Sequence, residues 1–292
     1  MEKPTKEQPL VVIEKDKYNK ILTKLGEWSQ KEGPLPHHID AYGRLLRLQV
    51  EAKSRIAAPG LALDRELVSG RLRQGTPIVS FEDLLLDWPL VQELFRSVAL
   101  VLAEYAGQHP TDALGLEGLA SDVSRLKQAT GDWYQGKSLS TIAAENQVSD
   151  GLLAAAIQAA LYPFLAVHSE AILKMVDQEL WRRRYCPICG GKPDFSFLDK
   201  ERGARWLMCS RCDTEWLFQR LECPYCGTQS HDALTYFTNK QELYRLYTCK
   251  KCQSYIKVID LRKTSAEVLL PLERIMTADL DLQAVEAGYK AG

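Results

Sequence analysis

The sequence predicts an α+β fold, in which an N-terminal all-α helical domain is followed by two tandem small β modules and a C-terminal helix. Three observations predict this order. Apolar residues recur at steps of three and four through the first 180 residues. All eight cysteines lie between Cys186 and Cys252, each in a Cys-x-x-Cys pair. The cysteine segment repeats itself, because Cys-Pro-x-Cys-Gly at residue 186 recurs 37 residues later at Cys223.

These patterns divide the chain into four segments. The predicted boundaries are 1–180 for the helical domain, 181–221 for the first four-cysteine module, 222–262 for the second four-cysteine module, and 263–292 for a C-terminal helical segment.

The N-terminal segment is expected to hold six to eight helices in an orthogonal or bundle-like packing. Stretches such as 41–56 and 88–106 have helical spacing, and Gly- and Pro-containing breaks separate them. The longest apolar stretch, 152–167, is short for a membrane span and contains Gln158 and Pro163, so we predict a buried core helix and no membrane insertion. Residues 1–8 are charged and lack an apolar export signal, which predicts a cytoplasmic protein.

The charge of the chain is balanced overall and uneven locally. The 37 Lys and Arg residues face 38 Asp and Glu residues, so no global basic field favours nucleic acid. Residues 181–262 carry fifteen basic and nine acidic residues. We interpret the basic run "WRRRY" at 181–185 as the end of the long helix, where the helix dipole favours cations.

The cysteine pairs indicate metal ligation. In a reducing cytosol, Cys-x-x-Cys pairs hold metals more often than they form disulfides. Each pair directs two thiolates at one ion, and Gly190 and Gly227 can take the positive φ that turns backbone N–H groups toward the sulfurs. Four thiolates suit zinc or iron and leave no open position for a catalytic water. A structural or electron-handling role therefore remains.

The linkers decide which pairs share an ion. Residues 213–222 contain no Gly, Pro or Asn, and read as a strand that would separate Cys212 from Cys223 by roughly 20–30 Å. The other two linkers contain charged reversals, "LDKERGAR" at 198–205 and "TNKQE" at 238–242. The predicted metal ligands are Cys186, Cys189, Cys209 and Cys212 for one site, and Cys223, Cys226, Cys249 and Cys252 for the other.

Other chemistries are disfavoured. Thioredoxin-like dithiol exchange needs a βαβ frame, which does not surround these turns. His231 follows Cys226 closely, but the second site already has four thiolates. Neither a Ser-His-Asp pattern nor a phosphate-binding loop is present in the sequence, so we predict that the protein is not an enzyme.

The order of motifs resembles the FdhE family of formate dehydrogenase accessory proteins. The resemblance covers 181–290, whereas in the helical half only arrangement and length agree. Its motifs are Cys-Pro-x-Cys-Gly at 186–190, "CSRCDTEW" at 209–216, "CPYC" at 223–226, "CKKCQSYIKVID" at 249–260, and the acidic stretch "ADLDLQAVEAGY" at 278–289.

This resemblance implies a cytoplasmic assembly factor with two rubredoxin-like or zinc-ribbon-like modules. The eight cysteines would be the ligands of two iron ions in tetrathiolate sites, with zinc as the alternative metal. The implied partner is the catalytic subunit of a molybdenum-dependent formate dehydrogenase. Two other hypotheses stay open, a zinc-ribbon protein that binds nucleic acid through its local basic excess and a rubredoxin-like electron carrier. The sequence carries no signal for or against self-association.

Overall fold

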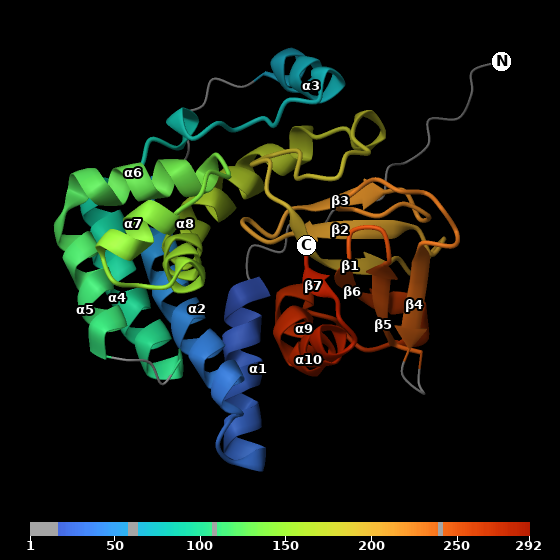
Figure 1. Cartoon of the computed structure of the whole chain (residues 1–292). Helices are drawn as coiled ribbons and strands as arrows, with labels where there is room; N and C mark the ends of the chain where they lie inside the picture. The colour runs from blue at the N-terminus through green and yellow to red at the C-terminus, as the bar shows by residue number, and fades with distance from the viewer. Residues whose placement is uncertain (1–16, 58–63, 107–109, 239–241) are drawn as a thin grey trace.

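The computed structural model describes residues 17–57, 64–106, 110–238 and 242–292. Helices gather on one side and a β-sheet on the other, which confirms the predicted α+β class (Figure 1). The charged N-terminal stretch 1–8 and positions 239–241 of the predicted "TNKQE" reversal lie outside the described residues.

The helical part agrees with the expected number of helices. Side chains cap several of them, since Asp64, Asp122 and Ser149 each accept a backbone N–H of the first turn. The described residues up to Ile172 form α1 (Lys17–Glu32), α2 (His37–Arg55), α3 (Arg65–Gln74), α4 (Trp88–Ala106), α5 (Pro110–Ser121), α6 (Val123–Tyr134), α7 (Ser140–Glu145) and α8 (Asp150–Ile172).

Helix α8 is the core helix of this part. It contacts α2, α4, α6 and α7, and its apolar side chains belong to the largest hydrophobic cluster. By length and composition alone, Asp150–Met175 could cross a membrane, but 61% of its most apolar window is buried inside the protein. The core helices of soluble proteins pass the same test, and the packing of α8 agrees with the buried helix expected from the sequence.

The basic run at 181–185 does not end the long helix, so that interpretation was wrong. Helix α8 ends at Ile172, and two short 3-10 turns, Leu173–Met175 and Gln178–Leu180, follow it. Trp181 is fully buried, and its indole N–H donates to the carbonyl of Tyr185 at 2.9 Å. Burying this ring in the core pulls the chain out of helical geometry ahead of the first cysteine.

The strands of both repeats form one sheet with the order β3-β2-β1-β6-β5-β4. Each repeat supplies three antiparallel strands, and the parallel pair β1–β6 joins the two repeats, with Phe195 opposite Lys257. The short strand β7 pairs in parallel with β6. The strands are β1 (Pro193–Leu198), β2 (Arg205–Cys209), β3 (Glu215–Phe218), β4 (Leu234–Thr238), β5 (Tyr244–Cys249), β6 (Ser254–Asp260) and β7 (Lys290–Ala291).

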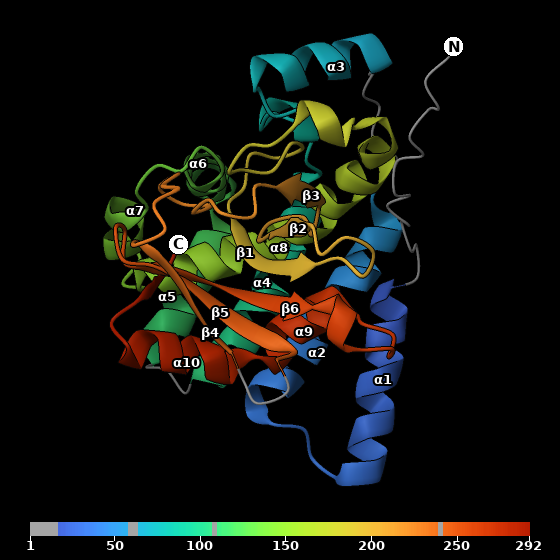
Figure 2. The ribbon, with the colours of Figure 1, turned by 90° about the vertical axis from the view of Figure 1, so that its right-hand side faces the viewer.

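The predicted C-terminal helix consists of two helices, α9 (Leu270–Met276) and α10 (Ala278–Glu286), which lie beside the sheet (Figure 2). Helix α10 contacts β6 and β7, while α9 contacts α2 of the helical part. One hydrophobic cluster continues from the helices into the first repeat, where it includes Ile188, Trp216 and Phe218. The division of the chain at 180, 221 and 262 stays a prediction. Because the helices and the first repeat share this hydrophobic cluster, separate expression of 1–180 would test whether that segment folds alone.

Candidate metal centres

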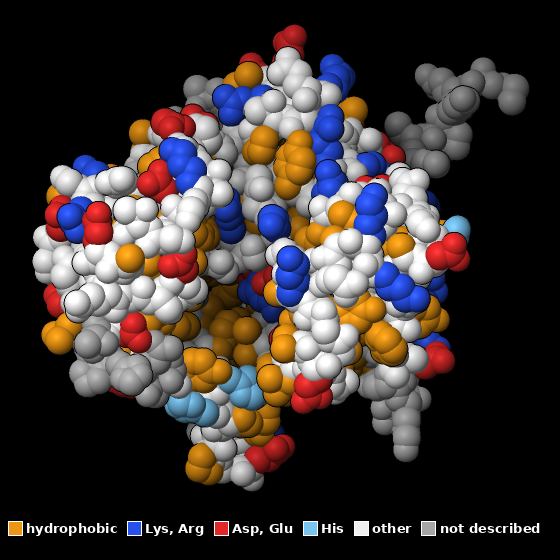
Figure 3. Space-filling model, viewed as in Figure 1, with side chains coloured by type: hydrophobic (Ala, Val, Ile, Leu, Met, Phe, Trp, Pro, Cys, Tyr) orange, Lys and Arg blue, Asp and Glu red, His pale blue; other side chains and the backbone are white. Residues whose placement is uncertain are grey.

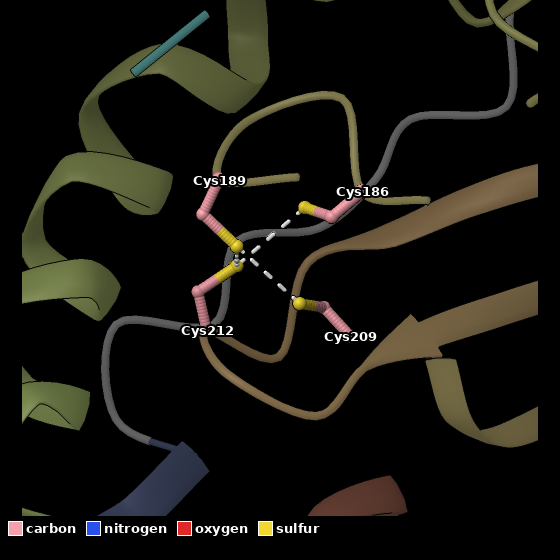
Figure 4. Close-up of side chains that lie close together, drawn as sticks. All are labelled: Cys186, Cys189, Cys209 and Cys212. Carbon is pink, nitrogen blue, oxygen red and sulfur yellow. Dashed lines mark hydrogen bonds between the residues drawn. The ribbon is translucent and has the colours of Figure 1, made fainter. Parts of the chain in front are cut away.

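The first centre consists of Cys186, Cys189, Cys209 and Cys212, whose sulfurs point toward one another (Figure 4). Cys189 Sγ lies 3.5 Å from Cys209 Sγ and 3.5 Å from Cys212 Sγ, and Cys186 Sγ lies 3.7 Å from Cys212 Sγ. A tetrahedron with metal–sulfur bonds of about 2.3 Å has edges of about 3.8 Å. The spacing of these sulfurs therefore fits a single tetrahedral ion.

The second centre consists of Cys223, Cys226, Cys249 and Cys252. Its sulfurs are spaced like those of the first, with 3.7 Å from Cys223 Sγ to Cys252 Sγ and 3.7 Å from Cys226 Sγ to Cys249 Sγ. In each centre, all four sulfurs lie within 4.8 Å of one another. This is the grouping that the linker argument predicts; that these thiols ligate metal stays a prediction.

The linker between Cys212 and Cys223 separates the centres with less strand than expected. Only Glu215–Phe218 form a strand, and the chain turns again at 220–222. The reversal at 198–205 is present, because Asp199 N donates to Ala204 O at 3.0 Å and Gly203 has φ 63. His231 is exposed and is not among the ligating groups found in the described residues.

The backbone of the cysteine turns directs N–H groups toward the sulfurs. Gly190 and Gly227 have φ 70 and φ 73, as the sequence indicated. Backbone N–H groups donate to sulfur, with Ile188 N to Cys186 Sγ at 3.4 Å, Arg211 N to Cys209 Sγ at 3.3 Å, and Tyr225 N to Cys223 Sγ at 3.5 Å. In the fourth turn, backbone hydrogen bonds from Cys252 and Lys251 to Cys249 oppose the rise that burial causes in its pKa. Such bonds spread the charge of a thiolate and orient it toward the ion.

Sequence reasoning missed two hydroxyl groups. Thr214 Oγ1 lies 3.0 Å from Cys212 Sγ. Ser254, at the same place in the second repeat, donates to the carbonyl of Cys252 at 3.4 Å, and its hydroxyl lowers the pKa of the Cys252 thiol. Both follow the fourth cysteine of their centre by two residues. The residues between, Asp213 and Gln253, both have φ 55. The signal was a hydroxyl residue at the same offset in both repeats.

The fourth cysteine of each centre has a lowered pKa. Burial raises the pKa of Cys212, but hydrogen bonds from the other three thiols and Thr214 hold that pKa well below its ordinary value. Burial likewise opposes the ionisation of Cys252, yet Ser254 and the neighbouring thiols bring its pKa to about 7. Burial raises the pKa of Cys223 to about 12. The thiolate is the form of cysteine that ligates a metal, and a lowered pKa favours this form at Cys212 and Cys252.

The two centres differ in burial. All four cysteines of the first are buried, whereas Cys226 and Cys252 of the second are partly exposed. The helical part covers the first centre, since Ile78 N donates to Pro187 O at 2.9 Å and Val79 N to Ile188 O at 2.8 Å. Arg211 adds to this cover.

The Arg211 guanidinium lies 4.4 Å from the centroid of the Trp133 ring and donates to the carbonyls of Trp133 and Tyr134. Thr214 Oγ1 also lies 2.7 Å from Ser169 Oγ on α8. The first centre is therefore held by both halves of the molecule.

The chain is similar to known proteins in both sequence and fold. A family model described as the central domain of FdhE matches residues 185–220. An FdhE homolog of Aquifex aeolicus is 34% identical over 240 residues, which cover 81% of this chain and 79% of the relative. An FdhE of Salmonella paratyphi A is 38% identical over 111 residues, covering 37% of this chain and 35% of the relative. The crystal structure of FdhE from Pseudomonas aeruginosa covers 98% of this chain and 95% of its own, with a TM-score of 0.64 and 22% identity, and so shows the same fold.

Proposed function

Because this chain belongs to the FdhE family, we propose that it is a cytoplasmic, non-catalytic assembly factor for a molybdenum-dependent formate dehydrogenase, whose catalytic subunit it binds. The observation that carries the proposal is the pair of four-sulfur centres in a chain of this family. A tetrathiolate site has no open coordination position, so it suits structure or electron handling better than hydrolysis.

Each centre would hold one iron ion, with zinc as the alternative, since four thiolates accept both. The second centre also supports a second candidate function, that of a rubredoxin-like electron carrier. Its cysteines Cys226 and Cys252 are partly exposed, which would bring an iron ion close to a redox partner.

A cleft between the helices and the sheet offers a surface for the partner subunit (Figure 3). Two adjoining cavities of about 590 and 950 Å³ share Ala154, Gln158 and Asp194 among their lining residues. One wall presents small and apolar side chains of α2 and α8, and the opposite wall presents Lys257 of β6 and Arg274 of α9. A segment that combines apolar and polar side chains would complement both walls.

The test is capture of the purified catalytic subunit by the metal-loaded protein. We expect Ala155→Glu, an exposed cleft position on α8, to reduce capture by at least about tenfold, because burying an unpaired carboxylate in the complex costs more than the roughly 1.4 kcal/mol of a tenfold change. Ala144→Glu on α7 is the matched control, since Ala144 is exposed and does not line either cavity. The proposal is refuted if the wild-type protein captures nothing and a deletion strain keeps full dehydrogenase activity.

A further inference from the structure

A second, smaller cavity of about 220 Å³ lies beside the second centre, against the sheet. Strands β2, β4, β5 and β6 form one side of it, and the linker and cysteine turn at 220–225 form the other. Its volume is many times the roughly 10–15 Å³ that one water molecule needs. Leu221 and Tyr236, which are 58% and 56% exposed, also line it and place an apolar rim at its exposed side.

Arg205, on β2, lines this cavity although it is only 2% exposed. Its Nη1 donates to the carbonyl of Glu222 at 2.9 Å and its Nε to Ser196 Oγ at 3.4 Å. Its Nη2 is buried without a hydrogen-bond partner, and within the described residues Arg205 makes no ion pair. Burial lowers the pKa of this guanidinium, and an unpaired buried charge is costly.

Arg245, on β5, is a second cationic side chain of the cavity with an unmet donor. Its Nη2 pairs with Asp260 Oδ2 at 2.6 Å, while its Nε is buried without a partner. The same Asp260 carboxylate also accepts from Arg262, at 2.8 and 2.7 Å, so two guanidinium groups share one negative charge. The cavity lining also contains Arg220 and Glu222, so three guanidinium groups accompany one carboxylate there and positive charge is in excess.

Each of the two arginines lies close to a tyrosine ring of the cavity lining. The Arg205 guanidinium lies 5.1 Å from the centroid of the Tyr247 ring, and the Arg245 guanidinium lies 5.4 Å from that of Tyr236. The two rings lie 5.6 Å apart. Contact with a ring restricts the motion of each guanidinium group, and its planar fork of N–H donors matches the two oxygens of a carboxylate.

We propose that this cavity binds a carboxylate group, held by Arg205 and Arg245 and flanked by the tyrosine rings. Cys223 and Cys249 line the same cavity, so the thiolates of the second centre offset part of the positive charge. A singly charged, planar group fits this balance better than a phosphate. The carboxylate comes either from a free small molecule or from the C-terminus of a peptide. The inference does not rest on the assembly role proposed above.

The test measures binding to the full chain with both centres loaded with zinc, by titration calorimetry with benzoate, benzamide and the dipeptide acetyl-Gly-Phe. We expect saturable benzoate binding and at least about tenfold weaker binding of uncharged benzamide, because a charge-assisted pair is lost. Tighter binding of the dipeptide than of benzoate assigns the site to a peptide C-terminus, and the reverse order assigns it to a small molecule.

Two variants and one control locate the binding. Arg205→Gln and Arg245→Gln should each weaken benzoate binding by about tenfold, whereas Arg202→Gln, an exposed arginine outside the cavity, should leave it unchanged. Because Arg205 is buried, metal content and far-UV circular dichroism show whether the Arg205→Gln variant still folds. If it does not, the benzoate affinity of the Arg245→Gln variant tests the proposal. Absent benzoate binding, equal affinity for benzoate and benzamide, or equal affinity of Arg245→Gln and Arg202→Gln overturns the proposal.

Discussion

The two four-cysteine centres have the same local geometry and opposite surroundings. Both place sulfurs at 3.5–3.7 Å, both use a glycine with positive φ, and both place a hydroxyl residue after the fourth cysteine. The first lies inside the main hydrophobic core, and the second is partly open to solvent. The repeated sequence thus determines the local geometry of the four sulfurs. The helices determine how deeply each centre is buried and how far its stability is coupled to that of the whole fold.

The largest expected effect comes from removing one ligand of each centre. Cys189→Ser should lose one metal and lower the melting temperature by about 10 °C or more, because the structural energy of a tetrathiolate site is lost inside the shared core. Cys226→Ser should also lose one metal but lower the melting temperature by only a few degrees, since its centre is partly exposed. Metal analysis and thermal unfolding followed by helical dichroism measure both effects.

The same measurements test the grouping of the cysteines. Cys212→Ser should empty only the first centre and Cys223→Ser only the second, although the two residues are close in sequence. The grouping fails if these two variants lose the same ion. Equal melting temperatures for Cys189→Ser and Cys226→Ser would show instead that the helices do not depend on the first centre.

A smaller effect is expected in the rate of metal release. A chelator in solution should remove the ion of the second centre at least about tenfold faster than that of the first, because opening the covered site requires local unfolding of the contacts to Ile78 and Val79. A colorimetric chelator resolves the two phases, and Cys226→Ser should abolish the fast phase alone. A single phase of full amplitude would contradict the difference in burial.

Much of this arrangement is predictable from the sequence because it is local. The grouping of the thiols follows from which linkers can reverse, and the reversal at Gly203 is visible as a charged turn before a glycine. The helix count and the buried role of α8 follow from apolar spacing and length. These features depend on residues that are neighbours along the chain.

The rest depends on contacts between distant segments. The parallel pairing of β1 with β6, which fuses the repeats into one sheet, involves strands about sixty residues apart and leaves no local signal. The interpretation of 181–185 as a helix end was wrong for the same reason, because Trp181 is buried in the main hydrophobic cluster, which local spacing does not reveal. The cover over the first centre comes from residues near Ile78, which no cysteine spacing could indicate.

The smallest expected effect is the loss of unfolding free energy when the hydroxyl of Thr214 or of Ser254 is removed. Thr214→Val keeps the shape of the side chain but removes a hydroxyl that contacts both Cys212 Sγ and Ser169 Oγ, so it should cost about 1–3 kcal/mol of unfolding free energy. Ser254→Ala removes a hydroxyl that makes one long bond of 3.4 Å to the carbonyl of the partly exposed Cys252, and should cost only about 0.5–1.5 kcal/mol. Urea unfolding of the metal-loaded protein measures both. Because the two residues occupy the same position in their repeats, a larger cost for Ser254→Ala would mean that burial by the helices is not what distinguishes the centres.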